Sequence, residues 1–443
     1  MNNRGKPLST LELLKNRLIY LAMQIGKDTE DGNLLRMRIN DAWKTAYHFL
    51  GKNEKRPLDD DRFLEAHLFV YYFKNIETDI LTEDLHTFKR YLRTREITDN
   101  TSNFLLNRLF TRKRITNGNF DIELPPVNQK LLNDYSSDLK VAVELYSKLS
   151  SPKSSPSRYK NEEAVWLERI GRIRGYEPNP LLLAIYSKEK SPKKRIAFLE
   201  AYEKLLFIQT MRLGRTHDRN SGLYLSPESL KFISGKTNIE ILHTWLSNNI
   251  DAATKDENII DIISDWAKNG NGYYGWEAIR YFLFEYETSL MQTSKSTREK
   301  IDWDVFSKED YDNEYVSIEH IYPQKARDKY WTNRYQQFTP AQRKLLKNSL
   351  GNLLALSTPK NSSLGNKSFP DKVGNAKNSV GYCFGSYSEN EVAQQDNWTH
   401  IEILNRGLKM LDFLEKRWSI TIGTQEQKIK CLGLTFINNQ VIT

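Results

Sequence analysis

A glutamate and a histidine stand next to each other in a short segment whose residues alternate between apolar and polar. The segment runs Val316-Ser-Ile-Glu-His-Ile-Tyr322 and then meets Pro323. This alternation predicts a short strand that ends in a turn, and neighbouring side chains of a strand point to opposite faces. We therefore expect Glu319 and His320 to divide two tasks. The carboxylate would hold a hard divalent cation, and the imidazole would face a water.

Two segments that bear asparagines follow, and they could complete such a site. Leu350-Gly-Asn-Leu353 begins a second strand candidate, and Asn361 lies in a stretch rich in asparagine, lysine and serine. An asparagine oxygen can complete a magnesium site, which typically has one or two carboxylates plus waters and substrate phosphate. An imidazole that titrates near neutral pH can accept a proton from an attacking water. Phosphodiester hydrolysis needs these two functions, with cations around the scissile phosphate.

The same part of the chain carries almost all of the excess positive charge. Residues 317–377 contain eleven lysines and arginines against three acidic residues, so eight of the nine net positive charges lie there. Aromatic residues are interleaved with them, namely Tyr322, Tyr330, Trp331, Tyr335, Phe338 and Phe369. This pattern is typical of a nucleic-acid surface, and the alternative is a solvated helical face with excess lysine.

These motifs resemble the HNH (His-Me finger) nucleases, and specifically the C-terminal nuclease domain of the GmrSD-type restriction family. The signature of that family is an acidic residue-His-Ile-x-Pro-Gln, then Gly-Asn-Leu, then an Asn with a nearby Lys and Phe. In this chain the matching residues are 319–324, 351–353, and Asn361 with Lys367 and Phe369. The resemblance covers about 300–418. Its outer parts are Ile301-Asp-Trp-Asp304 and a closing helix with Trp398, Ile403, Arg406 and Trp418.

The resemblance implies a role for each matching residue. His320 would be the general base, Glu319 a metal ligand, and Asn361 a second ligand of metal or phosphate. Asn352 would belong to the catalytic set by tying the histidine-bearing loop in place through hydrogen bonds. The residues implied to bind DNA are Lys367, Lys360, Lys325 and Arg327. The implied cofactor is Mg²⁺ or Mn²⁺, and the implied activity is cleavage of DNA in modification-dependent restriction of phage DNA.

A second resemblance concerns the first residues of the chain. Asn2-Asn-Arg-Gly-Lys-Pro-Leu-Ser9, followed by a leucine-rich helix, is similar to the late part of the ParB-like nucleotidase domain of the same family. The Asp-Gly-Gln-Gln-Arg motif of that domain does not occur here, nor does a phosphate-binding loop. We therefore expect the C-terminal portion of a longer architecture, whether a split subunit, a truncated gene or a wrongly assigned start. A separate chain would then supply any nucleotidase activity.

Helical periodicity dominates the first 300 residues. The predicted helices cover 10–25, 33–51, 61–75, 82–97, 128–149, 160–173, 178–188, 194–212 and two or three segments within 227–290. A linker is expected at 150–157 and a polar loop at 214–226. Beyond residue 300 we expect the strand at 316–322, a helical stretch at 325–347, a strand at 350–356, a final helix at 398–417 and a β-prone tail.

The predicted fold class is mainly α, in which many helices precede a small ββα-metal (His-Me finger) nuclease domain embedded in helices. The expected segments are a nucleotidase remnant at 1–30, a helical connector at 31–299, the nuclease at 300–418 and a tail at 419–443. Two cysteines cannot form a disulfide framework, and no apolar stretch approaches about 18 residues. A cytoplasmic protein without a membrane span is expected.

Other readings of the function stay open on the sequence. The chain could be a non-catalytic DNA-binding or scaffold subunit that needs a separate nucleotidase partner, and the missing N-terminal motif favours this rival. It could also be a ribonuclease, because His-Me sites attack phosphodiesters generally. One site cuts one strand, so either nicking or double-strand cutting by a homodimer is expected. The scattered histidines outside the motif and the aromatic stripe at 276–286 are interpreted as ordinary structure, the stripe as core.

Overall fold

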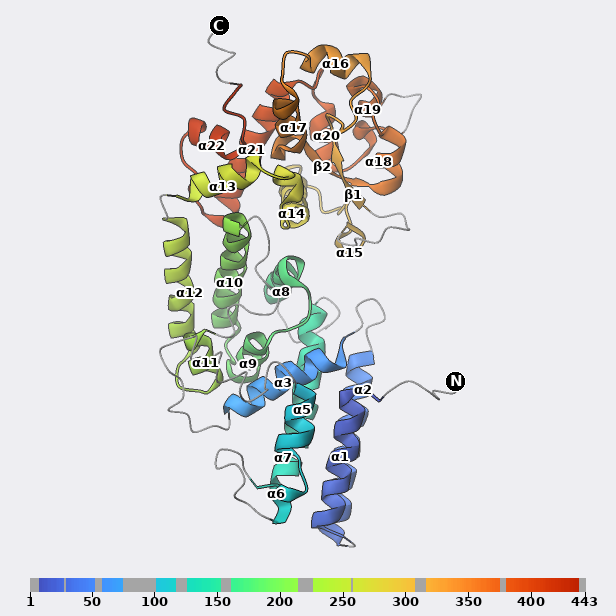
Figure 1. The fold of residues 1–443 in the computed structure, drawn as a ribbon, viewed down its shortest axis with the longest axis vertical. Helices are drawn as coiled ribbons and strands as arrows, with labels where there is room; N and C mark the ends of the chain where they lie inside the picture. The colour runs from blue at the N-terminus through green and yellow to red at the C-terminus, as the bar shows by residue number, and fades with distance from the viewer. Residues whose placement is uncertain are drawn as a thin grey trace. The chain divides into compact units, whose positions relative to one another are not determined.

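The structure, a computed structural model, describes residues 8–27, 29–51, 58–74, 101–116, 126–152, 161–213, 226–255, 258–306, 316–374 and 380–437. These residues are mainly helical, as predicted from the sequence (Figure 1). The chain divides into two compact units. The first comprises Met1–Glu203 and Asp218–Asn248, and the second comprises Lys204–His217 and Asn249–Thr443. Two helices, α10 and α12, contribute residues to both units.

The first unit is built of helices whose apolar faces meet in its core. Its elements are α1 (Thr10–Ile25), α2 (Glu30–Gly51), α3 (Asp60–Lys74), α5 (Thr101–Asn103), the π-helix η1 (Phe104–Leu109), α6 (Lys113–Thr116), α7 (Gln129–Ser150), α8 (Asn161–Arg174), α9 (Pro180–Lys188), α11 (Pro227–Ile233) and parts of α10 (Pro192–Leu213) and α12 (Ile239–Thr254). A capping box begins α1: the hydroxyl of Ser9 accepts from the backbone amide of Glu12, and the carboxylate of Glu12 accepts from the backbone amide of Ser9. The predicted helix at 82–97 lies outside the described residues, as do most of the linker and the polar loop.

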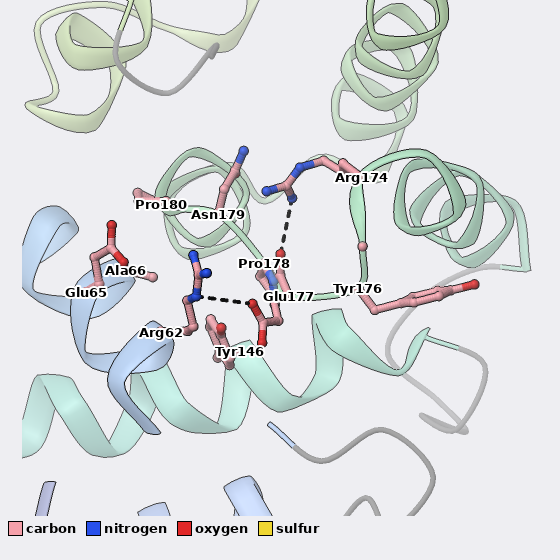
Figure 2. Close-up of a pocket in the computed structure, with 11 residues that line it drawn as sticks. Arg62, Glu65, Ala66, Tyr146, Arg174, Tyr176, Glu177, Pro178, Asn179 and Pro180 are labelled. Carbon is pink, nitrogen blue, oxygen red and sulfur yellow. Dashed lines mark hydrogen bonds and ion pairs between the residues drawn. The ribbon is translucent and has the colours of Figure 1, made fainter. Parts of the chain in front are cut away.

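A polar cavity of about 370 Å³ opens in the first unit, between α3, α7 and the segment that joins α8 to α9 (Figure 2). Two arginines and two glutamates line it. Arg62 approaches Glu177 at 3.9 Å, and Arg174 donates to the carbonyl of Glu177 at 3.2 Å. Because these opposite charges balance, the lining shows no preference for an anionic or a cationic ligand.

The second unit carries the sequence motifs. After the ends of α10 and α12 its elements are α13 (Ile259–Lys268), the 3-10 helix η4 (Gly272–Gly275), α14 (Ile279–Thr293), α15 (Trp303–Phe306), β1 (Val316–His320), α16 (Lys329–Tyr335), α17 (Pro340–Asn348), η5 (Leu350–Asn352), β2 (Leu353–Ser357), α18 (Thr358–Leu364), α19 (Phe369–Val373), η6 (Tyr382–Phe384), α20 (Tyr387–Ala393), α21 (His400–Trp418) and α22 (Gln425–Cys431). The aromatic stripe at 276–286 is core, as predicted: Trp276, Tyr281 and Tyr286 are buried. Phe207 of α10 stacks on Trp418 with ring centroids 3.5 Å apart.

The two strands pair antiparallel, with His320 opposite Leu353 and Val316 opposite Ser357. Residues 321–352, with α16, α17 and η5, connect the two strands, and β2 leads directly into α18 (Figure 1). The helical stretch predicted at 325–347 contains two helices in the structure, α16 and α17. Thr339 and Pro340 begin α17 with a capping box, which ends the preceding segment. The predicted strand at 350–356 opens as a 3-10 turn and becomes β2 only at Leu353.

Gly351 lies against the backbone of α21. A Cβ at this position would come within 2.0 Å of the carbonyl oxygen of Ile403 and 2.6 Å of the amide nitrogen of Gly407. Arg406 of the same helix donates to the carbonyls of Gly351 and Leu353, each at 2.8 Å. The glycine of the Gly-Asn-Leu motif is therefore required so that η5 can reach α21.

The prediction of a β-prone tail is wrong for residues 425–431, which form α22. Thr424 and Gln427 cap this helix reciprocally, and Ile429 and Cys431 are buried. Contacts with α13 and α21 stabilise α22, so α21 is not the final helix. In the part of the chain that the structure describes, no helix is both long and apolar enough to cross a membrane.

Candidate active site

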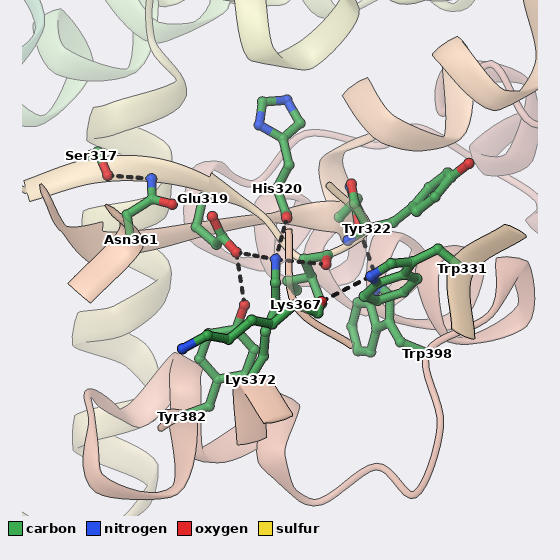
Figure 3. Close-up of polar contacts among 12 residues, drawn as sticks. Ser317, Glu319, His320, Tyr322, Trp331, Asn361, Lys367, Lys372, Tyr382 and Trp398 are labelled. Carbon is green, nitrogen blue, oxygen red and sulfur yellow. Dashed lines mark hydrogen bonds and ion pairs between the residues drawn. The ribbon is translucent and has the colours of Figure 1, made fainter. Parts of the chain in front are cut away.

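Glu319 and His320 point to opposite faces of β1, as the alternation of a strand requires (Figure 3). Both side chains are nearly enclosed, with 4% of Glu319 and 7% of His320 exposed. β1 ends at His320, and the segment that follows it is attached to η5 through a bond from the amide of Ile321 to the carbonyl of Asn352, at 3.1 Å. The structure thus confirms the opposite orientation expected for this pair.

The Glu319 carboxylate is bound by two groups that the sequence reasoning missed. The ammonium of Lys372 donates to its Oε1 at 2.5 Å, and the hydroxyl of Tyr382 donates to the same oxygen at 3.0 Å. Lys372 also donates to the carbonyls of His320 and Ile321, each at 3.1 Å. The three protons of this fully buried ammonium therefore have three acceptors, all of them in or next to β1.

Burial and charge act against each other in this pair. Burial raises the pKa of Glu319, while the ammonium of Lys372 and the hydroxyl of Tyr382 lower it. Burial likewise lowers the pKa of Lys372, and the charge of Glu319 raises it. A buried carboxylate is costly without a counter-charge, so Lys372 supplies the compensation that Glu319 needs in this fold.

His320 lies under an aromatic ring and beside two amides. The ring of Tyr274 is 4.5 Å from the imidazole, measured between centroids. Nε2 of His320 is 3.3 Å from Oδ1 of Asn348 and 3.4 Å from Nε2 of Gln324. Burial is the largest cause that lowers the pKa of His320 to about 4, with smaller contributions from the charges of Lys372 and Lys347. This pKa lies below the near-neutral value expected from the sequence: the imidazole is neutral at pH 7, and its burial makes it a weaker base than a solvated histidine.

Asn352 is completely buried and uses both ends of its amide. Oδ1 accepts from the backbone amide of Tyr322 at 2.8 Å and from the indole of Trp398 at 3.1 Å. Nδ2 donates to the carbonyls of Tyr322 at 3.0 Å and Lys347 at 2.8 Å. These bonds fasten the segment that follows His320 to η5, to the end of α17 and to Trp398, which is the geometry expected for this asparagine.

Asn361 lies on α18, beside the face of β1 that carries Glu319 (Figure 3). Its Nδ2 donates to the hydroxyl of Ser317 at 2.6 Å, and Ser317 and Glu319 share one face of the strand because they are two residues apart. Glu319, Asn361 and Ser317 carry oxygens of the type that Mg²⁺ prefers, and Oε1 of Glu319 already accepts from Lys372 and Tyr382. Among the described residues no group of three His, Cys, Asp or Glu side chains could hold a metal ion, so a cation here would depend on amide, water or phosphate oxygens.

The four cations expected to bind DNA have different environments. Lys367, Lys325 and Arg327 are exposed. The ammonium of Lys360 pairs with the largely buried Glu389 instead. The carbonyl of Lys367 accepts from the indole of Trp331 at 2.9 Å, which fixes the backbone of that residue near α16. Three of the four side chains are therefore accessible to a phosphate.

Sequence reasoning could have found some of the missed residues. Lys372 stands in the basic window, residues 317–377, where a lysine is ordinarily solvated. Nothing in its local sequence marks it as buried. Tyr382 and Tyr274 lie far along the chain from Glu319 and His320 and carry no motif. Gln324 belongs to the signature itself. Its contact with His320 indicates that it takes part in the surroundings of the imidazole.

These features define a mainly helical protein with a two-stranded antiparallel sheet, in which β1 presents a buried carboxylate and a buried imidazole on opposite faces. Residues 257–413 match the family model of the C-terminal domain of GmrSD restriction endonucleases. The match confirms the resemblance found in the motifs, and it begins earlier than residue 300, two residues before α13. The family indicates a nuclease role related to restriction and DNA as the substrate. No curated protein matches the sequence.

Proposed function

We propose that this chain is a metal-dependent DNA endonuclease of the HNH type that acts in restriction of foreign DNA. The observation that carries the proposal is the position of His320 at the end of β1, where its Nε2 lies 3.3 Å from Oδ1 of Asn348 and the preceding residue in the strand is a buried glutamate. A neutral imidazole accepts a proton from a water that attacks phosphorus, and this is the general-base role. The match to a restriction endonuclease domain supports the same reaction class.

The other residues of the site prepare this step. Asn352 fixes the backbone after His320 and thereby the direction of the imidazole. Glu319 and Asn361 would hold a divalent cation, which supplies stabilisation of the charge that develops on the phosphate oxygens and the leaving oxygen. Lys367, Lys325 and Arg327 would bind the phosphates on either side of the scissile bond. The basic window thus has the charge that a polyanionic substrate needs.

Cleavage of supercoiled plasmid by the full chain tests the proposal. The reaction is run with Mg²⁺, with Mn²⁺ and with EDTA, on plain and on glucosylated DNA, beside an RNA substrate. His320→Ala is the test variant. Glu426→Ala is the matched control, because Glu426 is an exposed residue of α22 away from the site. Metal-dependent cutting of DNA that is lost only in His320→Ala is the expected result.

Other outcomes would favour the rival functions. Cutting of RNA in preference to DNA would indicate a ribonuclease. DNA binding without cutting, with every metal and on every substrate, would contradict autonomous catalysis and favour a binding or scaffold subunit that needs a nucleotidase partner. Nicked circles as the main product would indicate one site acting on one strand. Linear product whose yield rises with protein concentration would indicate a homodimer.

A further inference from the structure

The carboxylate of Glu319, which would hold the divalent cation, already has the ammonium of Lys372 beside it. Lys372 is completely buried, and its Nζ is 2.5 Å from Oε1 of Glu319. Tyr382 donates to the same oxygen. Figure 3 shows Lys372 and Tyr382 converging on Glu319 from the side of the strand away from His320. One carboxylate oxygen is therefore occupied by donors from this chain alone.

The segment that supplies these donors is held in place by close backbone packing. Lys372 lies on α19 and Tyr382 on η6. Between them, a Cβ at Gly381 would come within 2.2 Å of the carbonyl oxygen of Val373 and 2.5 Å of Cα of Gly374. Only glycine allows η6 to approach α19 so closely. The local sequence thus brings the lysine and the tyrosine to Glu319 together.

The consequence for a divalent cation is electrostatic. Two like charges a few ångströms apart repel strongly where water is excluded, and 4% exposure of Glu319 leaves little water to screen them. Glu319 needs a counter-charge when no metal is bound, and the ammonium provides it. The same ammonium then opposes any cation that approaches the carboxylate.

We infer that Lys372 is a resident counter-ion of Glu319, which keeps the site folded without metal and weakens the binding of a divalent cation there. The inference rests on the proposed function, because it takes Glu319 as the metal ligand. Lys372 is a positioning residue in this account: it acts through Glu319 and does not touch the substrate. The site would therefore fill only at high cation concentration, or when DNA phosphate adds negative charge.

Calorimetric titration of the full chain with Mn²⁺ tests the inference without measuring cleavage. The variants are Lys372→Met, which keeps the length of the side chain and removes its charge, Glu319→Gln, and the double variant. Lys372→Met should bind Mn²⁺ about tenfold more tightly than the wild type because the repulsion is gone. The double variant should lose this binding. Its two neutral side chains can pack in place of the ion pair, which makes it a control for folding.

A second measurement uses the wild-type pair itself. Lysine labelled with ¹³C at Cε gives a resonance for Lys372 that is assigned by its absence in Lys372→Arg. Saturating Mg²⁺ should shift this resonance, because the charge next to the ammonium changes. An unshifted Lys372 resonance at a Mg²⁺ concentration that fills the site would overturn the inference, even if Lys372→Met did not fold.

The titrations separate this inference from the proposed function. Mn²⁺ binding that depends on Glu319 but is no tighter in Lys372→Met contradicts only the role of Lys372. Binding that is the same in the wild type and in Glu319→Gln contradicts the proposed metal site itself. Tighter binding in Lys372→Met that the double variant abolishes supports both.

Discussion

The side-chain amide of Asn352 pairs with the backbone of Tyr322, accepting from its N–H at 2.8 Å and donating to its carbonyl at 3.0 Å. This two-bond pairing resembles one rung of a β-ladder, but a side chain provides one side of it. It continues the strand pairing past His320, where β1 has ended. The asparagine of the Gly-Asn-Leu motif therefore extends the pairing of the two strands to Tyr322, two residues beyond His320.

Replacing Asn352 with alanine should destabilise the second unit. The change leaves buried backbone groups of Tyr322 and Lys347 and the indole of Trp398 without their partner. We expect the free energy of unfolding to fall by about 3 kcal/mol, measured by urea denaturation. Asn366→Ala is the control because Asn366 is exposed in a turn. Equal stability of the two variants would contradict the role given to Asn352.

Gly351→Ala should be more damaging than its size suggests. The new Cβ would lie 2.0 Å from the carbonyl oxygen of Ile403, so η5 and α21 must separate. We expect a loss of at least about 3 kcal/mol in the free energy of unfolding, seen as a lower Tm. Gly51→Ala, where nothing lies within 4 Å of the added Cβ, provides the comparison and should leave Tm nearly unchanged.

The pH dependence of stability should report the burial of His320. Its pKa is lowered from 6.5 to about 4 in the folded chain, so the unfolded state binds the proton more tightly. The stabilisation from the neutral ring is complete above pH 6.5 and is lost as the pH falls towards 4. Across this pH range, the free energy of unfolding of the wild type should fall by up to about 3 kcal/mol relative to that of His320→Gln. If the difference in the free energy of unfolding between the two proteins did not change with pH, folding would not lower the pKa of His320.

Tyr274 should control the pKa of His320, because its ring covers the imidazole at 4.5 Å. Tyr274→Ala should admit water to the imidazole and so reduce its burial, which is the largest cause of the lowered pKa. The pKa of His320 should therefore rise towards 6.5. Tyr274→Phe keeps the cover and should leave that pKa unchanged. Titration of the imidazole resonances by NMR measures both. If alanine and phenylalanine gave the same pKa, the cover would have to come from other groups.

The exposed cations should contribute to DNA affinity through salt-dependent contacts. Lys367→Ala and Arg327→Ala should each weaken binding and reduce the slope of log K against log salt by about 1. Lys360→Ala should leave that slope unchanged and lower stability instead, because Lys360 pairs with Glu389. Fluorescence anisotropy with a short duplex at several salt concentrations measures the slopes. An unchanged slope in Lys367→Ala would remove this residue from the DNA surface.

The sequence predicted those helices and strands of this fold that are determined by residues close together in the chain. The alternation at 316–320 indicated β1, and the capping box at Ser9 and Glu12 marked the start of α1. The tail was misread because its isoleucines and threonines favour a strand by propensity. Contacts with α13 and α21 decide in favour of the helix α22. The signal of that helix, the reciprocal cap between Thr424 and Gln427, was present in the sequence.

The site was harder to predict because its partners are distant along the chain. Glu319 and His320 could be found from their own segment, and Asn352 and Asn361 from ordered motifs. Lys372 meets Glu319 across 53 residues, and its side chain is buried although Lys325, Arg327 and Lys367 of the same window are exposed. A charge count treats all these lysines alike. Only the packing of α19 and η6 shows that one of them belongs to the interior.

The passage of α10 into the second unit has a consequence for how this domain can be isolated. Phe207 of α10 stacks on Trp418, and the indole of Trp276 donates to the carbonyl of Thr210 at 3.1 Å. All the α10 residues lie before the family match, which starts at 257, and Trp418 lies beyond its end at 413. A gene fragment cut at those limits would expose the indole of Trp276 and lose the ring stack, and we expect it to aggregate when expressed. A soluble version of the domain must begin upstream of α10 and continue through α22.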